Sequence, residues 1–298
     1  MVNARRLIGA TPFAVIFAAF SGFAWAQWPL YATKNVLTTK DGKPDLNGPV
    51  PRASDGKPDL TGIWGAARRT GGGQRGAASG AAIPQPNQRP DARPEEQASA
   101  DGGPPPATFF NIGAGFKEGL PLTPWAAEVR RQRESTHAKD NPDAHCLPIG
   151  LMQLHLHPQP RKIIQTPGVI VILYEAQGET RQIFTDGRPI PNNDPQPWWR
   201  GYSSGHWEGD TLVVETVGFR DDVWLDVNGS PLTGAGKMTE RFRRPDYGNL
   251  QIDITIEDPK AYTKPFTVRV NQRVMLDTDL IEFVCNENER SSPFYSDK

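Results

Sequence analysis

The residues best suited to chemistry lie in one short run, GYSSGHWEGDTLVVETVGF, at positions 201–219. His206, Glu208 and Asp210 alternate there, so on an unbroken strand their side chains would share one face as a ligand or acid–base cluster. The Glu-Gly-Asp stretch is also typical of a hairpin bend, in which glycine supplies the positive φ and the aspartate hydrogen-bonds the turn. Alternation stops at such a bend. The hypothesis therefore narrows to His206 before the turn and Glu215 after it, as partners across the hairpin.

An enzyme built on these residues would need no cofactor. His206 would act as acid or base, and Glu215 or Arg188 would orient the substrate of a lyase, isomerase or hydrolase. Arg188 leaves an Asp-Gly turn that begins at Asp186. It could pair with a nearby carboxylate as part of that turn, or its fork could hold a ligand carboxylate or sugar hydroxyl at the mouth of a cup.

A second set of residues is suited to binding a carbohydrate or an aromatic compound. Adjacent tryptophans in a proline-flanked loop either pack beneath the end of a barrel or form a flat platform for a ligand. A glutamate on a half-buried strand either pairs with an arginine of a neighbouring strand or faces a cavity as an acid or base. The candidate ligand-binding residues are Trp198, Trp199, Tyr202, Arg181 and Glu240.

A metal site is a further alternative. In QLHLHP, His155 and His157 would point to one face of a strand, a spacing that zinc sites use, and His145 could supply a third ligand. The prolines that follow favour an edge strand or no strand, and exposed or hydrogen-bonded histidines are the competing interpretation. No Walker, Rossmann, G-x-S-x-G or C-x-x-C motif is present in the sequence. We therefore assign no cofactor.

The fold that must position these residues is predicted to be mainly β. From Cys146 onward the apolar period is two, as in LQIDITIED, FTVRVNQRV and DLIEFV, with turn residues between the runs. This pattern predicts an antiparallel β-barrel or sandwich, with a lipocalin-like cup as one form. One helix is expected after Thr123, its N-cap, with Pro124 in the first turn and a stop at Asn141-Pro142.

The first residues resemble an export signal. A basic start, an apolar stretch and Ala24-x-Ala26 predict cleavage after Ala26, and hence a periplasmic or extracellular protein. A Gly/Pro/Ala-rich tract within residues 66–107 cannot bury enough apolar surface to offset the entropy lost on ordering, so it is expected to be disordered. The expected divisions are 1–26 (signal peptide), 27–65 (turn and strand segment), 66–107 (low-complexity disordered insertion), 108–145 (helix-containing connector), 146–290 (β-barrel domain) and 291–298 (tail).

Charge and cysteine content limit the partners. The net charge is -1 without long runs of either sign, so we expect a small-molecule ligand, no nucleic acid and no stable membrane insertion after cleavage. In an exported protein the two cysteines, Cys146 and Cys285, are expected to form one disulfide, with a pair of unrelated buried thiols as the alternative.

Several blocks resemble a family of secreted bacterial proteins of unassigned function: RQIFTDGRP, GHWEGDTLVVETVGF, TERFRR and DPKAYTKPF. The likeness runs from Cys146 to Glu289 and implies export and a mostly β domain, without a reaction that could be carried over. A further block of the family is WLD, at residues 224–226 here. Members tend to have a His-Pro-His-Ser-Glu stretch after it, whereas residues 229–236 of this chain read GSPLTGAG. The GIW at 62–64 also resembles the G-x-W opening strand of lipocalin-like barrels.

Overall fold

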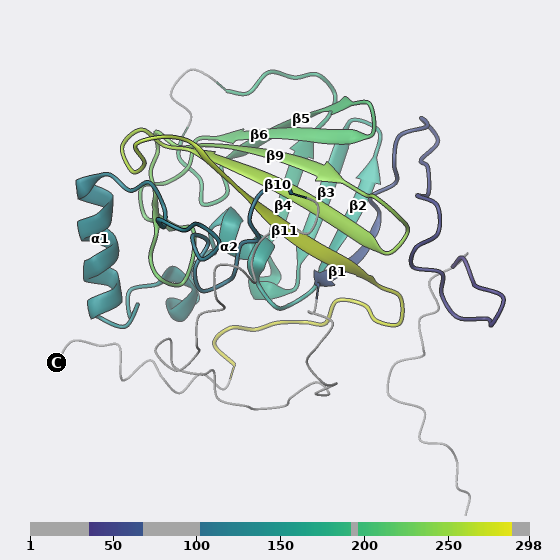
Figure 1. Cartoon of the computed structure of the whole chain (residues 1–298), viewed down its shortest axis with the longest axis horizontal. Helices are drawn as coiled ribbons and strands as arrows, with labels where there is room; N and C mark the ends of the chain where they lie inside the picture. Colours follow the sequence, from purple (N-terminus) through teal and green to yellow (C-terminus); the bar gives the residue numbers. More distant parts are fainter. Residues whose placement is uncertain (1–35, 68–101, 192–195, 288–298) are drawn as a thin grey trace, which may run out of the picture.

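Nine strands close into a barrel in the computed structural model, which describes residues 36–67, 102–191 and 196–287 (Figure 1). Neighbouring strands follow the order β1-β11-β10-β9-β6-β5-β4-β3-β2, and β2 pairs again with β1. The barrel strands are β1 (Gly62–Ala66), β2 (Arg161–Thr166), β3 (Val169–Tyr174), β4 (Thr180–Phe184), β5 (Tyr202–Glu208), β6 (Thr211–Val217), β9 (Lys237–Arg243), β10 (Asn249–Glu257) and β11 (Phe266–Met275). The predicted mainly β barrel is confirmed.

Alternation along the strands decides which side chains face inward. In β10 every second residue is buried, and Ile254 pairs with Val268 of β11 on one side and with Glu240 of β9 on the other. Residues directly opposite each other in an antiparallel pair share a face. Glu240 therefore points into the barrel beside an isoleucine, while its neighbours Thr239 and Arg241 point outward.

The barrel wall has one weak join, between β4 and β5. These strands run parallel and pair only at Ile183 with Ser203 and at Phe184 with Ser204. The antiparallel β5–β6 hairpin, in contrast, is paired along the full 7 residues of each strand. We call this region the β4–β5 seam.

The hairpin bend predicted within GHWEGD is confirmed. Glu208 pairs with Thr211, and Gly209 at the bend has φ +58°, a left-handed conformation that glycine adopts without strain. Asp210 forms a two-pronged ion pair with Arg52 of the N-terminal segment, at 2.5 and 2.7 Å. The aspartate thus ties the hairpin to a remote part of the chain.

Two α-helices and two short 3₁₀ helices accompany the barrel in the part of the chain that the structure describes. The predicted helix is present as α1 (Pro124–Ser135), and the hydroxyl of its N-cap, Thr123, accepts a hydrogen bond from the Ala126 amide. It ends earlier than predicted, before a series of turns that reaches the short 3₁₀ helix η3 (Pro142–His145). Among the helices described, no apolar run is long enough to cross a bilayer.

The second helix, α2 (Leu151–Leu156), was not predicted; an edge strand or no strand was expected around His155 and His157, and His157 is the C-cap of the helix. The helix was missed because it is short and its first five residues, Leu151 to His155, are all buried. A helix buried on every side has no apolar stripe with period 3.6, so the alternating His-Leu-His sequence showed the pattern of a strand.

The predicted strand DLIEFV is also absent. Residues 279–284 have no regular structure, and Ile281 and Val284 are 62% and 51% exposed. The reason is that β11 already pairs on both edges, with β10 and with β1, so no ladder remains for a further strand to join. The wall is closed by β1, which lies outside the predicted barrel boundaries of 146–290. The expected signal peptide and most of the 66–107 insertion lie outside the described residues.

The repeated DGKPDLxG sequence folds twice into the same turn. In the first copy the Thr39 amide donates to Lys43 O, and in the second, 14 positions later in the sequence, the Ala53 amide donates to Lys57 O. The first copy is bonded to the loop after β9 through Gly48 O and the Tyr247 amide. The second copy leads into β1.

The disulfide prediction is confirmed. Cys146 and Cys285 are joined, and they are 139 positions apart in the sequence. The bond ties the segment just before α2 to the chain that follows β11.

Replacement of both cysteines by serine (Cys146→Ser with Cys285→Ser) is expected to lower the free energy of unfolding by about 4–5 kcal/mol, because a long loop is freed in the unfolded state. Urea unfolding followed by tryptophan fluorescence measures this change. A loss below about 1 kcal/mol would contradict a stabilising role for the bond.

Candidate functional site

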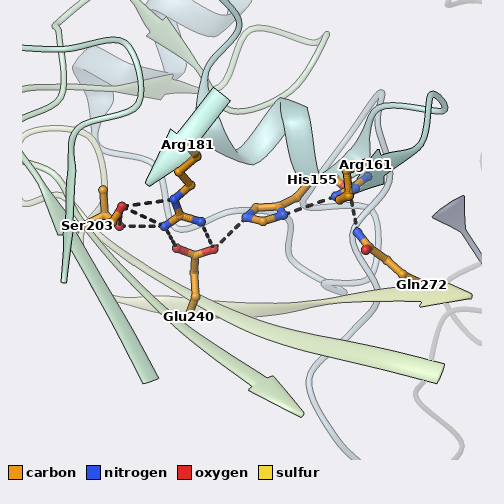
Figure 2. Close-up of polar contacts among 7 residues, drawn as sticks. His155, Arg161, Arg181, Ser203, Glu240 and Gln272 are labelled. Carbon is orange, nitrogen blue, oxygen red and sulfur yellow. Dashed lines mark hydrogen bonds and ion pairs between the residues drawn. The ribbon is translucent and has the colours of Figure 1, made fainter. Parts of the chain in front are cut away.

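A chain of buried polar side chains crosses the interior of the barrel (Figure 2). At its centre Glu240 of β9 accepts hydrogen bonds from Arg181 of β4 and His155 of α2. Arg181 Nη1 lies 2.9 Å from Glu240 Oε1, Arg181 Nη2 bonds to Oε2, and His155 Nε2 lies 2.7 Å from Oε1. The His155 and Glu240 side chains are fully buried and that of Arg181 is 2% exposed, so these groups pair with one another in place of water.

The other side of the Arg181 guanidinium is held by hydroxyl groups. Its Nε donates to Ser203 Oγ at 3.1 Å, and its Nη2 donates to Thr216 Oγ1 at 3.0 Å. Ser203 and Thr216 are inward residues paired across β5 and β6, and their oxygens are 3.0 Å apart. The Arg181 side chain is thus held by the hydroxyl groups of Ser203 on β5 and Thr216 on β6 and by the carboxylate on β9.

The electrostatics of the centre follow from burial and charge. Burial alone would raise the pKa of Glu240, but the charge of Arg181 and the hydrogen bond from His155 outweigh it and lower the pKa to about 2. Burial also lowers the pKa of His155 below its ordinary 6.5, and the bond to Glu240 opposes this only in part. At neutral pH the site therefore holds a carboxylate, a guanidinium and a neutral imidazole.

The neutral imidazole has a defined tautomer. A carboxylate only accepts hydrogen bonds, so the proton lies on His155 Nε2, which donates to Glu240. Nδ1 is then the acceptor, 3.4 Å from Arg161 Nη1. Arg161 of β2 and Gln272 of β11 complete the chain, because both donate to the His155 carbonyl oxygen, at 3.0 and 3.4 Å. We call the set formed by Glu240, Arg181, His155, Arg161, Gln272, Ser203 and Thr216 the polar network.

A cavity of about 500 Å³ lies at the β4–β5 seam and reaches one end of the polar network, since Arg181 and Ser203 both line it. We call it the seam pocket. Most of its walls are apolar or aromatic, formed by Phe184, Pro189, Ile190, Pro191, Pro197, Trp198, Trp199 and Tyr202. Arg188, Arg200 and Arg220 also line it, together with polar residues of β4 and β5.

The aromatic wall is an ordered stack. The Trp198 and Tyr202 rings lie 4.4 Å apart with an interplanar angle of 27°, and the Tyr202 hydroxyl donates to Gln196 O at 3.1 Å. Trp198 is bonded through its amide to Gly218 O at 2.9 Å, and yet its residue is 53% exposed. A large ring that is anchored but half open to solvent is suited to stacking on a ligand.

The arginines of the seam pocket are held by carboxylates that do not line it. Arg188 donates through Nε and Nη2 to Asp186, its partner in the predicted Asp-Gly turn, and lies over the Phe184 ring at 3.8 Å. Arg220 pairs in the same manner with Asp222 and lies 4.7 Å from the Trp199 ring centre. Both guanidinium groups are therefore oriented before any ligand binds.

The three residues predicted to act in catalysis are not brought together. His206 and Glu215 lie on the outer face of β5 and β6, diagonal to each other across the hairpin, whereas Arg188 lies in the seam pocket. His206 is 3.3 Å from Glu208, and Glu215 is paired with Lys237 at 2.5 Å.

The predicted ligand-binding residues divide into two places. Trp198, Trp199, Tyr202 and Arg181 line the seam pocket, and Arg181 also belongs to the polar network. Glu240 lies behind Arg181 and does not line the pocket. Its arginine partner lies on the distant strand β4, while the neighbouring Arg241 pairs with Glu208 on the outer face.

The three histidines proposed as metal ligands have separate partners. His155 bonds to Glu240, His157 to Gln159 and Asp143, and His145 Nε2 lies 2.6 Å from Lys139 O. Within the described part of the chain, no group of three or more His, Cys, Asp or Glu is arranged to hold a metal ion.

Sequence reasoning missed Arg161, Gln272, Ser203 and Thr216. For His155 it weighed a metal site against an exposed or hydrogen-bonded histidine, and the structure shows a hydrogen-bonded one. Arg161 and Gln272 occupy inward positions of β2 and β11, and a charged or amide residue at such a position was the available signal. It was not decisive because the neighbours of these strands in the barrel were unknown.

Comparison of the chain with protein-family models, with curated proteins and with solved structures yields no match. The geometry of the polar network and of the seam pocket therefore carries the functional conclusions.

Replacement of Glu240 by glutamine (Glu240→Gln) is expected to destabilise the barrel by about 3–5 kcal/mol, because it leaves the Arg181 charge buried without a counter-ion. The matched control is Glu215→Gln, which breaks an exposed pair with Lys237 and should cost at most about 1 kcal/mol. Equal effects of the two changes in urea unfolding would contradict the central role of Glu240.

Acidification is expected to destabilise the protein in two steps. His155 and Glu240 both have lowered pKa values in the folded state, so the unfolded state binds more protons. The free energy of unfolding therefore decreases as the pH decreases. The contribution of His155 is lost as the pH falls below 6.5, and that of Glu240 as the pH falls from 4.5 towards 2. Unfolding free energies measured against pH should show a weaker fall in the lower range for Glu240→Gln. An unchanged fall would contradict the assignment.

Proposed function

We propose that this barrel binds a small aromatic ligand in the seam pocket. The observation that carries the proposal is the ordered Trp198–Tyr202 stack, half open to solvent, on the wall of a cavity of about 500 Å³. Ligand pockets of this size with mostly apolar walls and a few placed polar groups suit drug-sized organic molecules.

The polar groups of the pocket favour a ligand with an acidic or hydroxyl substituent. Arg188 and Arg220 present guanidinium groups that are already oriented by Asp186 and Asp222. Their remaining N–H donors match the oxygens of a carboxylate or phenolate. A carbohydrate could also stack on Trp198, but it would not use the positive charge. An aromatic acid therefore fits the lining better than a neutral sugar.

We propose binding rather than catalysis as the activity. An enzyme built on His206, Glu215 and Arg188 required these groups to meet in one cavity, but Arg188 lines the seam pocket and His206 and Glu215 do not. The carboxylates bonded to Arg188, Arg220 and Arg181 are Asp186, Asp222 and Glu240, and each is engaged by its arginine. A periplasmic or extracellular location is part of the proposal, supported by the signal-like first 26 residues and the Cys146–Cys285 disulfide.

Isothermal titration with benzoate, benzyl alcohol and glucose tests the proposal. We expect measurable affinity for the aromatic compounds, strongest for benzoate, and an affinity about tenfold lower in Trp198→Ala, because the stacking face is lost. The matched control is Trp125→Ala, since Trp125 is 43% exposed on α1 and does not line the pocket.

Failure of both aromatic compounds to bind would overturn the proposal, as would equal affinities in the two tryptophan variants. If glucose binds more tightly than benzoate, the ligand of the seam pocket is a carbohydrate and not an aromatic compound.

A further inference from the structure

Arg161 lies at the other end of the polar network from the seam pocket and is among the most deeply buried charged residues of the barrel. Its residue is 1% exposed, and it projects inward from β2, opposite Trp64 of β1. Burial lowers its pKa to about 10, so the guanidinium is still charged at neutral pH. A buried charge is stable only if it is paired.

Only one edge of this guanidinium is used. Nη1 donates to the His155 carbonyl oxygen at 3.0 Å and lies 3.4 Å from His155 Nδ1. Nε and Nη2, which are buried, have no hydrogen-bond acceptor within the described part of the chain. These two groups form the side edge of the guanidinium, whose parallel N–H bonds match the two oxygens of a carboxylate.

The network does not contain a second carboxylate for this edge. Both oxygens of Glu240 are bonded to Arg181, and one also accepts from His155. His155 is neutral, so the polar network as described holds the charges of Arg161 and Arg181 against the single charge of Glu240. The polar network therefore carries one positive charge in excess.

Two buried amide side chains also have atoms without a partner among the described residues. Gln272 donates to the same His155 carbonyl as Arg161, yet its Oε1 has no donor there. Gln153 of α2 is fully buried, and neither of its amide atoms has a partner there. The two amide oxygens need a donor, which ordered water supplies and a carboxylate does not, so the unpartnered N–H groups of Arg161 are the ones that match an anion.

We propose that Arg161 binds a small carboxylate-type anion inside the barrel, through its Nε and Nη2 groups, as a second site separate from the seam pocket. The anion supplies the missing negative charge between α2, β2 and β11. It is a structural ligand that stabilises the folded barrel, and the site does not depend on the proposed aromatic ligand.

Thermal unfolding of the full chain in formate tests this site. Protein dialysed against formate-free buffer is titrated with sodium formate, with sodium perchlorate keeping the ionic strength constant. The unfolding midpoint should rise with the logarithm of the formate concentration above Kd, by roughly 5–10 °C at a concentration about 100 times Kd. Arg161→Met should remove this rise. Arg188→Met, which removes an arginine of the seam pocket, should retain it.

A second variant keeps the test decisive if Arg161→Met does not fold. Gln272→Glu adds a carboxylate beside Arg161, so its midpoint should be higher than that of the wild type without formate and should no longer respond to it. A midpoint that formate does not raise, or a response that survives in Arg161→Met or in Gln272→Glu, would mean that solvent satisfies Arg161 and would overturn the proposal. Loss of the response in Arg188→Met would place the anion in the seam pocket and also overturn it.

Discussion

The buried carboxylate of Glu240 is the constraint on which the rest of the barrel depends. An ionised carboxylate inside an apolar wall costs several kcal/mol unless charges and hydrogen bonds surround it. Here the partners come from β4, through Arg181, and from α2, through His155. These elements are not neighbours of β9 in the sheet, so the requirement to pair one charge fixes parts of the molecule that backbone ladders do not connect.

The same arginine links the interior to the seam pocket. Arg181 is bonded to Glu240 on one edge and to Ser203 and Thr216 on the other, and it also contributes to the pocket wall. The pocket forms where β4 and β5 share only two paired positions, so side chains rather than backbone complete the wall. A ligand there would rest on a positively charged floor whose position is set in advance.

The sequence predicted those features that depend on local pattern. The inward face of β10, the bend at Gly209, the Thr123 cap and the Cys146–Cys285 bond were all correct, because each depends on adjacent residues or on a single possible pairing. The errors concern α2 and the strand expected at 279–284, where burial on all sides and the prior occupation of a sheet edge by β1 overrode the pattern.

The candidate site was predictable only in part. Alternation placed Glu240 on an inward face but did not give its partner, which is 59 positions away in the sequence on a strand that is not its neighbour. Trp198 and Trp199 were found because aromatic residues in a loop are costly to expose. Arg161 and Gln272 lie at inward positions of their strands, but this signal did not identify their partners, because the order of the strands in the barrel was unknown.

The disulfide divides the barrel unequally. Cys146 and Cys285 enclose eight of the nine barrel strands in one covalent ring, and β1 alone lies outside it. This strand nevertheless closes the wall between β2 and β11 and contributes Trp64 to the core. The molecule is thus a covalently looped sheet completed by a short strand from elsewhere in the chain. In oxidised protein, β1 is the strand that could be exchanged for the same strand of another copy without breaking a covalent bond.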